Sequence, residues 1–385
     1  MIAISDIQKK YGNEIAMLML CCRVFLKTED LSALEQFVHA HTLDWDEVYH
    51  LAKVHRIRYI VYETTLPLQS LDLKFKEQLK QAYLNHSVRA FRCQQKAHQL
   101  VALMQQHQIP IQVYKGIHLS QQLYNHLSLR EFSDIDFIVN EEDIPRLVAT
   151  LKTAGYKVEG ATLFEDSEEK YLKHQKDVIC YDDSPEGFFL YEFHYKPVGS
   201  YLATNISFND LFAPSWQVGK DLSLCEYLPL LTVNHGLVDR YPTLRCMIDI
   251  ALLTQKCKQS TCYRLPQLLS GYYSLNAYII EKLFSVQVTE YPAYPDTRFI
   301  TQQGEQIIQW LLKKKEASRV PLSAIIKVAY RLRSGLFEKI KLVKAVVKYI
   351  LTPNYNDTTN AQQQPKWMYV LSRPIRLLQH LKRYI

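Results

Sequence analysis

The sequence predicts an α+β protein, in which a small mixed sheet is flanked by N-terminal and C-terminal helical regions. Apolar residues recur at the three- and four-residue spacing of helices in both outer parts of the chain, and short strand-like runs lie between them. A chain of 385 residues is too long for one hydrophobic core. Two or three domains are therefore expected, and the pattern divides the chain into a helical region 1–108, an α/β core 109–200, a helical domain 201–312 and a basic amphipathic region 313–385.

The N-terminal region is expected to be a helical scaffold. One helix face is visible in Ile15, Leu18, Met19 and Cys22. Further along, Thr42 or Asp44 is expected to cap a short helix, because a side-chain oxygen at that position accepts from the free backbone N–H groups of the first turn.

The hydrophobic period changes near residue 109. We expect strands at 109–114 and 135–139, and helices at 117–125 and 144–154. Gly155 follows the second helix, where glycine is the usual residue. This alternation predicts the start of an α/β unit.

A hairpin is expected next, with strands at 177–181 and 188–195. The connector 182–187 is rich in turn formers, so Asp182 and Asp183 are interpreted as turn residues. Helical periodicity then returns from Leu222 to about Leu312. A polar loop is expected between Pro353 and Pro365, within the basic amphipathic end of the chain.

The most informative motif is Asp134-Ile135-Asp136 at the start of an apolar run. Side chains alternate along a strand, so these two carboxylates should lie on one face. Like charges held so close repel unless a cation lies between them. Carboxylate oxygens are ligands that Mg²⁺ accepts, usually together with substrate phosphates. The pattern predicts a divalent metal site.

Lys115-Gly116 supplies a phosphate site upstream, where the first strand meets a helix. Backbone N–H groups at a helix N-terminus attract phosphate, and glycine lets it approach the chain. Glu192 and His194 alternate with aromatic residues in the later strand, and both should point away from the core. If that strand pairs with the Asp134–Asp136 strand, Glu192 becomes a third carboxylate at the metals.

These positions resemble the DNA polymerase β-type nucleotidyltransferase superfamily and, more narrowly, a bacterial family of largely uncharacterised nucleotidyltransferases. Lys115-Gly116, Ser133-Asp134-Ile135-Asp136 and Glu192-Phe193-His194 resemble its Lys-Gly, Gly-Asp-x-Asp and Asp-x-His elements. The broad superfamily has Gly-Ser where this chain has Gly116-Ile117, so no serine hydroxyl is present there. Weaker likenesses are found at Tyr124, Arg130, His235-Gly236 and residues 244–249, 351–353 and 373–378.

The resemblance implies a nucleotidyltransferase core at 109–200. It also implies transfer of NMP from an NTP such as ATP to a hydroxyl of a small molecule, a glycan or a macromolecule, with two Mg²⁺ ions and release of pyrophosphate. The residues implied as catalytic and metal-binding are Asp134, Asp136 and Glu192. Those implied as nucleotide-binding are Lys115, Gly116, Arg130 and His194.

Several alternatives stay open at this stage. The fold could serve as a non-catalytic module that binds a nucleotide or a partner protein, although the three intact acids favour an enzyme. Arg130 either contacts the triphosphate or forms a plain salt bridge with Asp134 or Asp136. His194 either contacts phosphate, carries a proton or is structural. His235 and Asp249 are interpreted first as packing or helix–helix polar contacts.

Composition indicates a folded, cytoplasmic protein. The apolar share of 48% excludes global disorder. The eight scattered cysteines are expected to be free and mostly buried, and the charged N-terminus does not read as a secretory signal. From Lys313 onward, 16 Lys and Arg face three acidic residues, a net charge of +13 against +7 for the whole chain. We expect peripheral contact with an anionic membrane through this end, and a nucleic-acid partner is less favoured.

Overall fold

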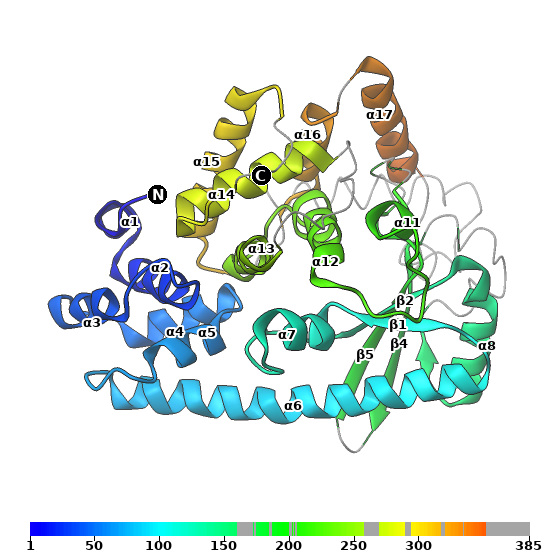
Figure 1. Cartoon of the computed structure of the whole chain (residues 1–385), viewed down its shortest axis with the longest axis horizontal. Helices are drawn as coiled ribbons and strands as arrows, with labels where there is room; N and C mark the ends of the chain where they lie inside the picture. The colour runs from blue at the N-terminus through cyan, green and yellow to red at the C-terminus, as the bar shows by residue number, and fades with distance from the viewer. Residues whose placement is uncertain are drawn as a thin grey trace, which may run out of the picture.

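A long helix, α6 (Leu73–Gln106), runs below both the N-terminal helices and the sheet in Figure 1. The N-terminal helices pack at one of its ends and the sheet at the other. The structure is a computed structural model and describes residues 1–159, 172, 175–184, 187–199, 202, 204, 206–257, 269–288, 294–316, 320–333 and 335–351. The helices before α6 are α1 (Ile4–Tyr11), α2 (Asn13–Phe25), α3 (Leu31–Ala40), α4 (Trp45–Val54) and α5 (Arg58–Thr65).

Side-chain caps fix the starts of two of these helices. The Asp44 carboxylate accepts from the Glu47 N–H at 3.1 Å, which confirms the expected cap of α4. The Asp72 carboxylate accepts from the Phe75 N–H at 2.8 Å at the start of α6. Each bond satisfies a donor that the helix itself leaves free.

The five-stranded sheet is mixed, with the order β1-β2-β5-β4-β3. Its central pair, β2 with β5, is parallel, and the other pairs are antiparallel. The α+β class and the small mixed sheet expected from the sequence are therefore confirmed. The strands are β1 (Ile111–Tyr114), β2 (Ile135–Val139), β3 (Lys157–Val158), β4 (Asp177–Ser184) and β5 (Gly187–His194), and the helices between them are α7 (Gly116–Tyr124) and α8 (Ile144–Thr153).

The two faces of the sheet have different roles. On one face, Phe137 and Phe193 stack at 4.8 Å and join a core cluster with the second half of α6 and with α8. Strand side chains alternate, so the neighbours of these two residues along the strands point to the opposite face. These neighbours include Asp136, Glu192 and His194. That face is turned toward the helical part of the molecule.

The N-terminal helices and the C-terminal helices share one hydrophobic core. Phe75 and Leu79 of α6 belong to it, whereas the later residues of α6 belong to the cluster under the sheet. The C-terminal helices are α11 (Phe208–Leu211), α12 (Leu224–Leu231), a π-helical segment (Thr232–Val238), α13 (Leu244–Lys256), α14 (Ser270–Phe284), α15 (Thr297–Lys313), α16 (Leu322–Arg331) and α17 (Leu336–Leu351). In the described ranges, no helix combines the length and apolar character that crossing a bilayer requires.

The structure corrects one sequence-based interpretation. Asp182 and Asp183 are not turn residues but belong to β4, opposite Phe189 and Phe188. Strand pairing with β5 continues to Ser184. The Asp182 side chain is held in the strand by an ion pair with Lys96 of α6, at 2.9 Å. The expected polar loop from Pro353 to Pro365 and the weaker likenesses at 352–353 and 373–378 lie outside the described residues.

The cysteines agree with the expectation of free thiols. The seven within the described ranges are free, and all except Cys225 are buried.

Candidate active site

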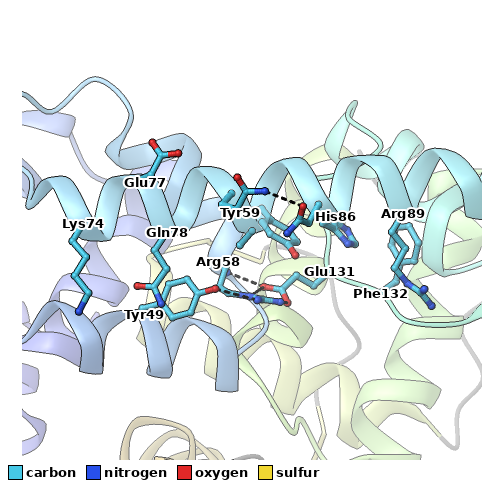
Figure 2. Close-up of a pocket in the computed structure, with 13 residues that line it drawn as sticks. Tyr49, Arg58, Tyr59, Lys74, Glu77, Gln78, His86, Arg89, Glu131 and Phe132 are labelled. Carbon is cyan, nitrogen blue, oxygen red and sulfur yellow. Dashed lines mark hydrogen bonds and ion pairs between the residues drawn. The ribbon is translucent and has the colours of Figure 1, made fainter. Parts of the chain in front are cut away.

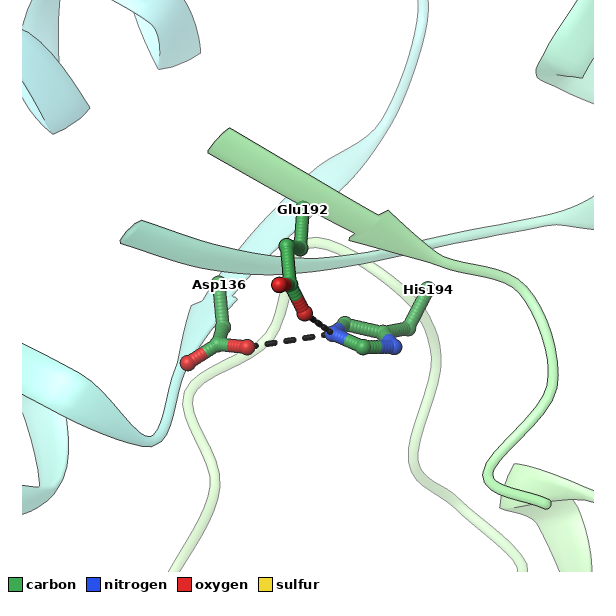
Figure 3. A group of neighbouring side chains, drawn as sticks. All are labelled: Asp136, Glu192 and His194. Carbon is green, nitrogen blue, oxygen red and sulfur yellow. Dashed lines mark hydrogen bonds and ion pairs between the residues drawn. The ribbon is translucent and has the colours of Figure 1, made fainter. Parts of the chain in front are cut away.

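Strand register brings Asp136 and Glu192 together. They are paired positions of the parallel β2–β5 ladder, and His194 pairs with Ile138 two positions further on. The His194 Nε2 lies 3.0 Å from Asp136 Oδ1 and 3.2 Å from Glu192 Oε2 (Figure 3). Among the described residues, these three form a group whose ligand atoms all lie within 4.8 Å of one another. Two carboxylates and an imidazole at this spacing fit a divalent cation.

Lys115 and His194 compensate the buried Asp136 carboxylate. Its Oδ1 lies 3.2 Å from Lys115 Nζ and 3.0 Å from His194 Nε2, and only 5% of the residue is exposed. Burial alone raises the pKa of Asp136, but Lys115 and His194 outweigh it and hold that pKa well below its usual range. Asp136 is thus ionised and ready to bind a cation.

Asp134 lies at the edge of this group. It precedes β2, which begins at Ile135, and its carboxylate is not among the three clustered ligands. Burial, and then the charges of Asp136 and Glu192, raise the pKa of Asp134, whereas Lys115 lowers it. The charges of Asp136 and Glu192 therefore act on Asp134, although its carboxylate does not belong to the group of three ligand atoms.

The Lys115-Gly116 segment has an unusual backbone. Lys115 has φ +52° and ψ −145°, a region that non-glycine residues rarely occupy, and Gly116 begins α7 with φ +32°. A Cβ on Gly116 would lie 3.3 Å from the Asp134 carbonyl oxygen. The absence of a side chain lets the α7 N-terminus approach the acidic segment, as a phosphate site requires.

A cavity of about 230 Å³ opens above these residues. Asp134, Asp136, Glu192, Lys115 and Gly116 line one side of it. Lys176, just before β4, also lines it, and so do residues of the helical parts, namely Arg56, His235, Asp239 and Arg245. The cavity therefore lies between the sheet and the helical part, and both parts of the chain form its wall.

Arg130 lines this cavity but has a different partner from the two considered from the sequence. Its Nε and Nη2 donate to the Asp249 carboxylate at 3.0 Å each, and neither Asp134 nor Asp136 pairs with it. Asp249 also accepts from Tyr124 Oη at 2.6 Å and contacts His235 Nε2 at 3.0 Å. This buried network joins α7 and the acidic loop to α13. The pair could not be expected from the sequence, because its members are 119 positions apart.

A second, larger cavity of about 840 Å³ lies between the α4–α5 region and α6 (Figure 2). Arg58 and Glu131 form an ion pair at 2.7 Å on its floor, and Tyr59 stacks on His86 with ring centroids 4.5 Å apart. Phe132 lines both cavities. The two cavities thus lie on either side of the chain segment that leads into the acidic motif.

The sequence analysis did not identify Arg56 or Lys176 as residues of the cavity. Arg56 lies in the turn between α4 and α5, a region interpreted as scaffold, and Lys176 lies just before β4. No local pattern marks either residue. The isolated positive φ of Arg56, +56°, becomes visible only in the structure.

A family model described as "Uncharacterised nucleotidyltransferase" matches residues 41–267, more than half of the chain. The chain belongs to this family. The match covers the sheet, the acidic segment and the helices that close the cavity. Searches of curated proteins and of solved structures return no match.

Proposed function

We propose that this protein is a Mg²⁺-dependent nucleotidyltransferase that moves NMP from an NTP to an acceptor hydroxyl and releases pyrophosphate. One observation carries the proposal. The parallel register of β2 and β5 pairs Asp136 with Glu192 at one cavity, with His194 and Lys115 beside them. Family membership makes a nucleotide the expected substrate.

Each side chain has a role in the proposed reaction. Asp136 and Glu192 are the proposed catalytic carboxylates that would hold Mg²⁺, and Asp134, at the edge of their group, is proposed to join them as the third carboxylate when the ion binds. Lys115 and the α7 N-terminus at Gly116 hold the triphosphate, and His194 orients the two carboxylates it contacts or meets a phosphate oxygen. Bound Mg²⁺, two ions in the arrangement expected from the sequence, supplies charge neutralisation and activation of the acceptor hydroxyl. Arg130 forms its ion pair with Asp249. Its proposed role is therefore to hold the cavity wall in place and not to bind the nucleotide directly.

The proposed function is tested with label on the transferred group. The purified protein is incubated with each α-labelled NTP, Mg²⁺ and a cell extract, and the products are separated by gel and thin-layer methods. We expect Mg²⁺-dependent label on one class of acceptor. A protein that binds NTP but labels nothing in any extract fraction would be a binding module instead.

The larger cavity is the proposed acceptor side of the enzyme. It opens beside the catalytic cavity across Phe132, and three amide side chains of α6 lie along it, Gln78, Gln81 and Asn85. Amides both donate and accept hydrogen bonds, which suits a hydroxyl-bearing acceptor. The helical flanks would thus select the acceptor while the sheet performs the chemistry.

Filling this cavity should impair acceptor use alone. Asn85 is exposed on α6 within the cavity lining. We expect Asn85→Trp to raise the KM for the acceptor about 10-fold or more and to leave NTP binding unchanged. The matched control is Gln95→Trp, an exposed position of α6 outside the lining. Equal acceptor KM values for both variants would place the acceptor elsewhere.

Helix α17 is the proposed contact with an anionic membrane surface. Five of its apolar residues are exposed: Leu336, Phe337, Ile340, Val343 and Val347. Lys341, Lys344 and Lys348 are exposed beside them, whereas Leu342 is fully buried and anchors the helix. An exposed apolar stripe flanked by lysines is typical of helices that lie in a membrane interface.

Removing the α17 charges should weaken vesicle binding. A variant with Lys341, Lys344 and Lys348 changed to Gln should bind phosphatidylserine-containing vesicles about 100-fold more weakly, since each lysine contributes about 1 kcal/mol. The control changes Lys9, Lys10 and Lys74 to Gln, exposed lysines of α1 and α6 at the far end of the molecule (Figure 1). Equal vesicle binding by the two variants, in a sedimentation assay, would refute this contact.

A further inference from the structure

Two arginines from outside the sheet line the catalytic cavity together with the carboxylates. Arg56 lies in the turn between α4 and α5, and Arg245 lies in the first turn of α13. The Arg245 N–H donates to the His55 carbonyl at 3.3 Å, next in the chain to Arg56. The segments that carry the two arginines are therefore docked on one another.

His55 makes this docking rigid. It is fully buried, and burial, followed by the charge of Lys314, lowers its pKa to about 3. The neutral ring accepts a hydrogen bond from the Leu244 N–H at its Nδ1, at 3.4 Å. Arg56 itself is held at φ +56°, a conformation that non-glycine residues adopt only when their surroundings enforce it. The backbone of both arginines is thus held in place by contacts within the protein.

Neither arginine has an ion-pair partner within the described ranges. Nearby Arg58 and Arg130 each have their own carboxylate, Glu131 and Asp249. Arg245 instead donates Nη1 to the Glu131 carbonyl oxygen at 3.0 Å, and its buried Nε has no hydrogen-bond partner among the described residues. Arg245 lines the cavity, so its guanidinium group is a charge at the cavity wall that no carboxylate of the described residues pairs with.

The repulsion between the Arg56 and Arg245 guanidinium groups also favours a bound anion. Partial desolvation, and then the nearby Arg245 guanidinium, lower the pKa of Arg56, whereas Asp134 and Glu131 raise it. Two guanidinium groups at one cavity repel one another unless an anion lies between them. Planar guanidinium forks bind phosphate oxygens with paired hydrogen bonds.

We infer that Arg56 and Arg245 clamp the phosphates of the nucleoside triphosphate that will leave as pyrophosphate, in the cavity that the carboxylates also line. This inference rests on the proposed function. It assigns the two ends of the substrate: the reacting phosphate would lie at the carboxylates that would hold Mg²⁺, and the leaving group would lie at the arginines. It also supplies phosphate ligands that the chain lacks next to Gly116, where Ile117 has no hydroxyl.

The test is calorimetric binding of inorganic tripolyphosphate and of each NTP, both with Mg²⁺. We expect Arg56→Ala to raise the Kd for tripolyphosphate and for NTP about 10- to 100-fold, the loss for hydrogen bonds to a charged group. Arg56→Lys should recover only part of this affinity, because lysine lacks the fork. The matched control is Lys53→Ala, an exposed cation of α4 that does not line the cavity.

The outcomes separate the inference from the proposed function. Arg56→Ala and Lys53→Ala with the same tripolyphosphate Kd as the wild type would overturn the clamp while leaving nucleotidyl transfer intact. Weaker tripolyphosphate binding by Arg56→Ala would support the clamp even if no transfer were found. A wild-type protein that binds neither probe would overturn both. A thermal melt of Arg56→Ala, whose side chain is exposed, is expected to match the wild type.

Discussion

Asp136→Asn is expected to abolish NMP transfer, with a fall in turnover of at least about 100-fold and an intact fold. The substitution keeps the size of the side chain and removes its charge. Asp136 is the acid that touches both Lys115 and His194 and that pairs in register with Glu192. Without its charge, the site loses the ligand around which the other groups are arranged. The measurement is label transfer under saturating Mg²⁺ and NTP.

The control for this variant is Asp182→Asn on the same sheet. Asp182 also pairs with a lysine, Lys96, at 2.9 Å, but it lies outside the catalytic cavity. Its loss should leave transfer unchanged and lower stability by about 1 kcal/mol or less. Full turnover by Asp136→Asn would show that the metal site was assigned to the wrong residues.

Asp249→Ala is expected to destabilise the protein by about 3–5 kcal/mol, because it leaves the Arg130 guanidinium buried without a partner. Asp249 is fully buried and Arg130 is 3% exposed. Tyr124 and His235 lose their shared partner at the same time. A thermal melt should show a fall in Tm of about 5 °C or more.

The matched control is an exposed ion pair. Lys74 and Asp46 lie 3.0 Å apart, with side chains 74% and 70% exposed, so Lys74→Ala should change stability by less than about 1 kcal/mol. Equal melts of Asp249→Ala and Lys74→Ala would contradict the structural role of the buried network.

The effect of Asp249 should also depend on pH. Burial opposes ionisation, but Arg130 and His235 hold the pKa of Asp249 well below its ordinary value of about 4. A lowered folded-state pKa stabilises the protein above the unfolded-state pKa, and this stabilisation is lost as the pH falls below it. The melts of wild type and Asp249→Ala should therefore converge in acid.

Local sequence patterns were sufficient for most of the elements. The apolar run at 135–139 corresponds to β2, and the alternation of aromatic and polar residues correctly places Glu192 and His194 on one face of β5. The error at Asp182 and Asp183 has a physical cause. Turn-forming residues are tolerated within β4 because the ladder to β5 and the contact with Lys96 outweigh their local preference.

The site was only partly accessible from sequence. The acids and Lys115-Gly116 could be named, because their chemistry and spacing are local. The role of Glu192 depended on the pairing of β2 with β5, and only the structure shows that these strands pair. The partner of Arg130 and the docking of Arg56 beside Arg245 join residues more than 100 positions apart, through contacts between helices that no periodicity encodes.

The central claim is that the transferred group is a nucleotidyl group. The most direct test supplies the same NTP in parallel with label at the α or the γ phosphate, with Mg²⁺ and the acceptor fraction. We expect the α label on the acceptor and the γ label in pyrophosphate. Transfer of γ label to the acceptor, which is phosphoryl transfer, would contradict it.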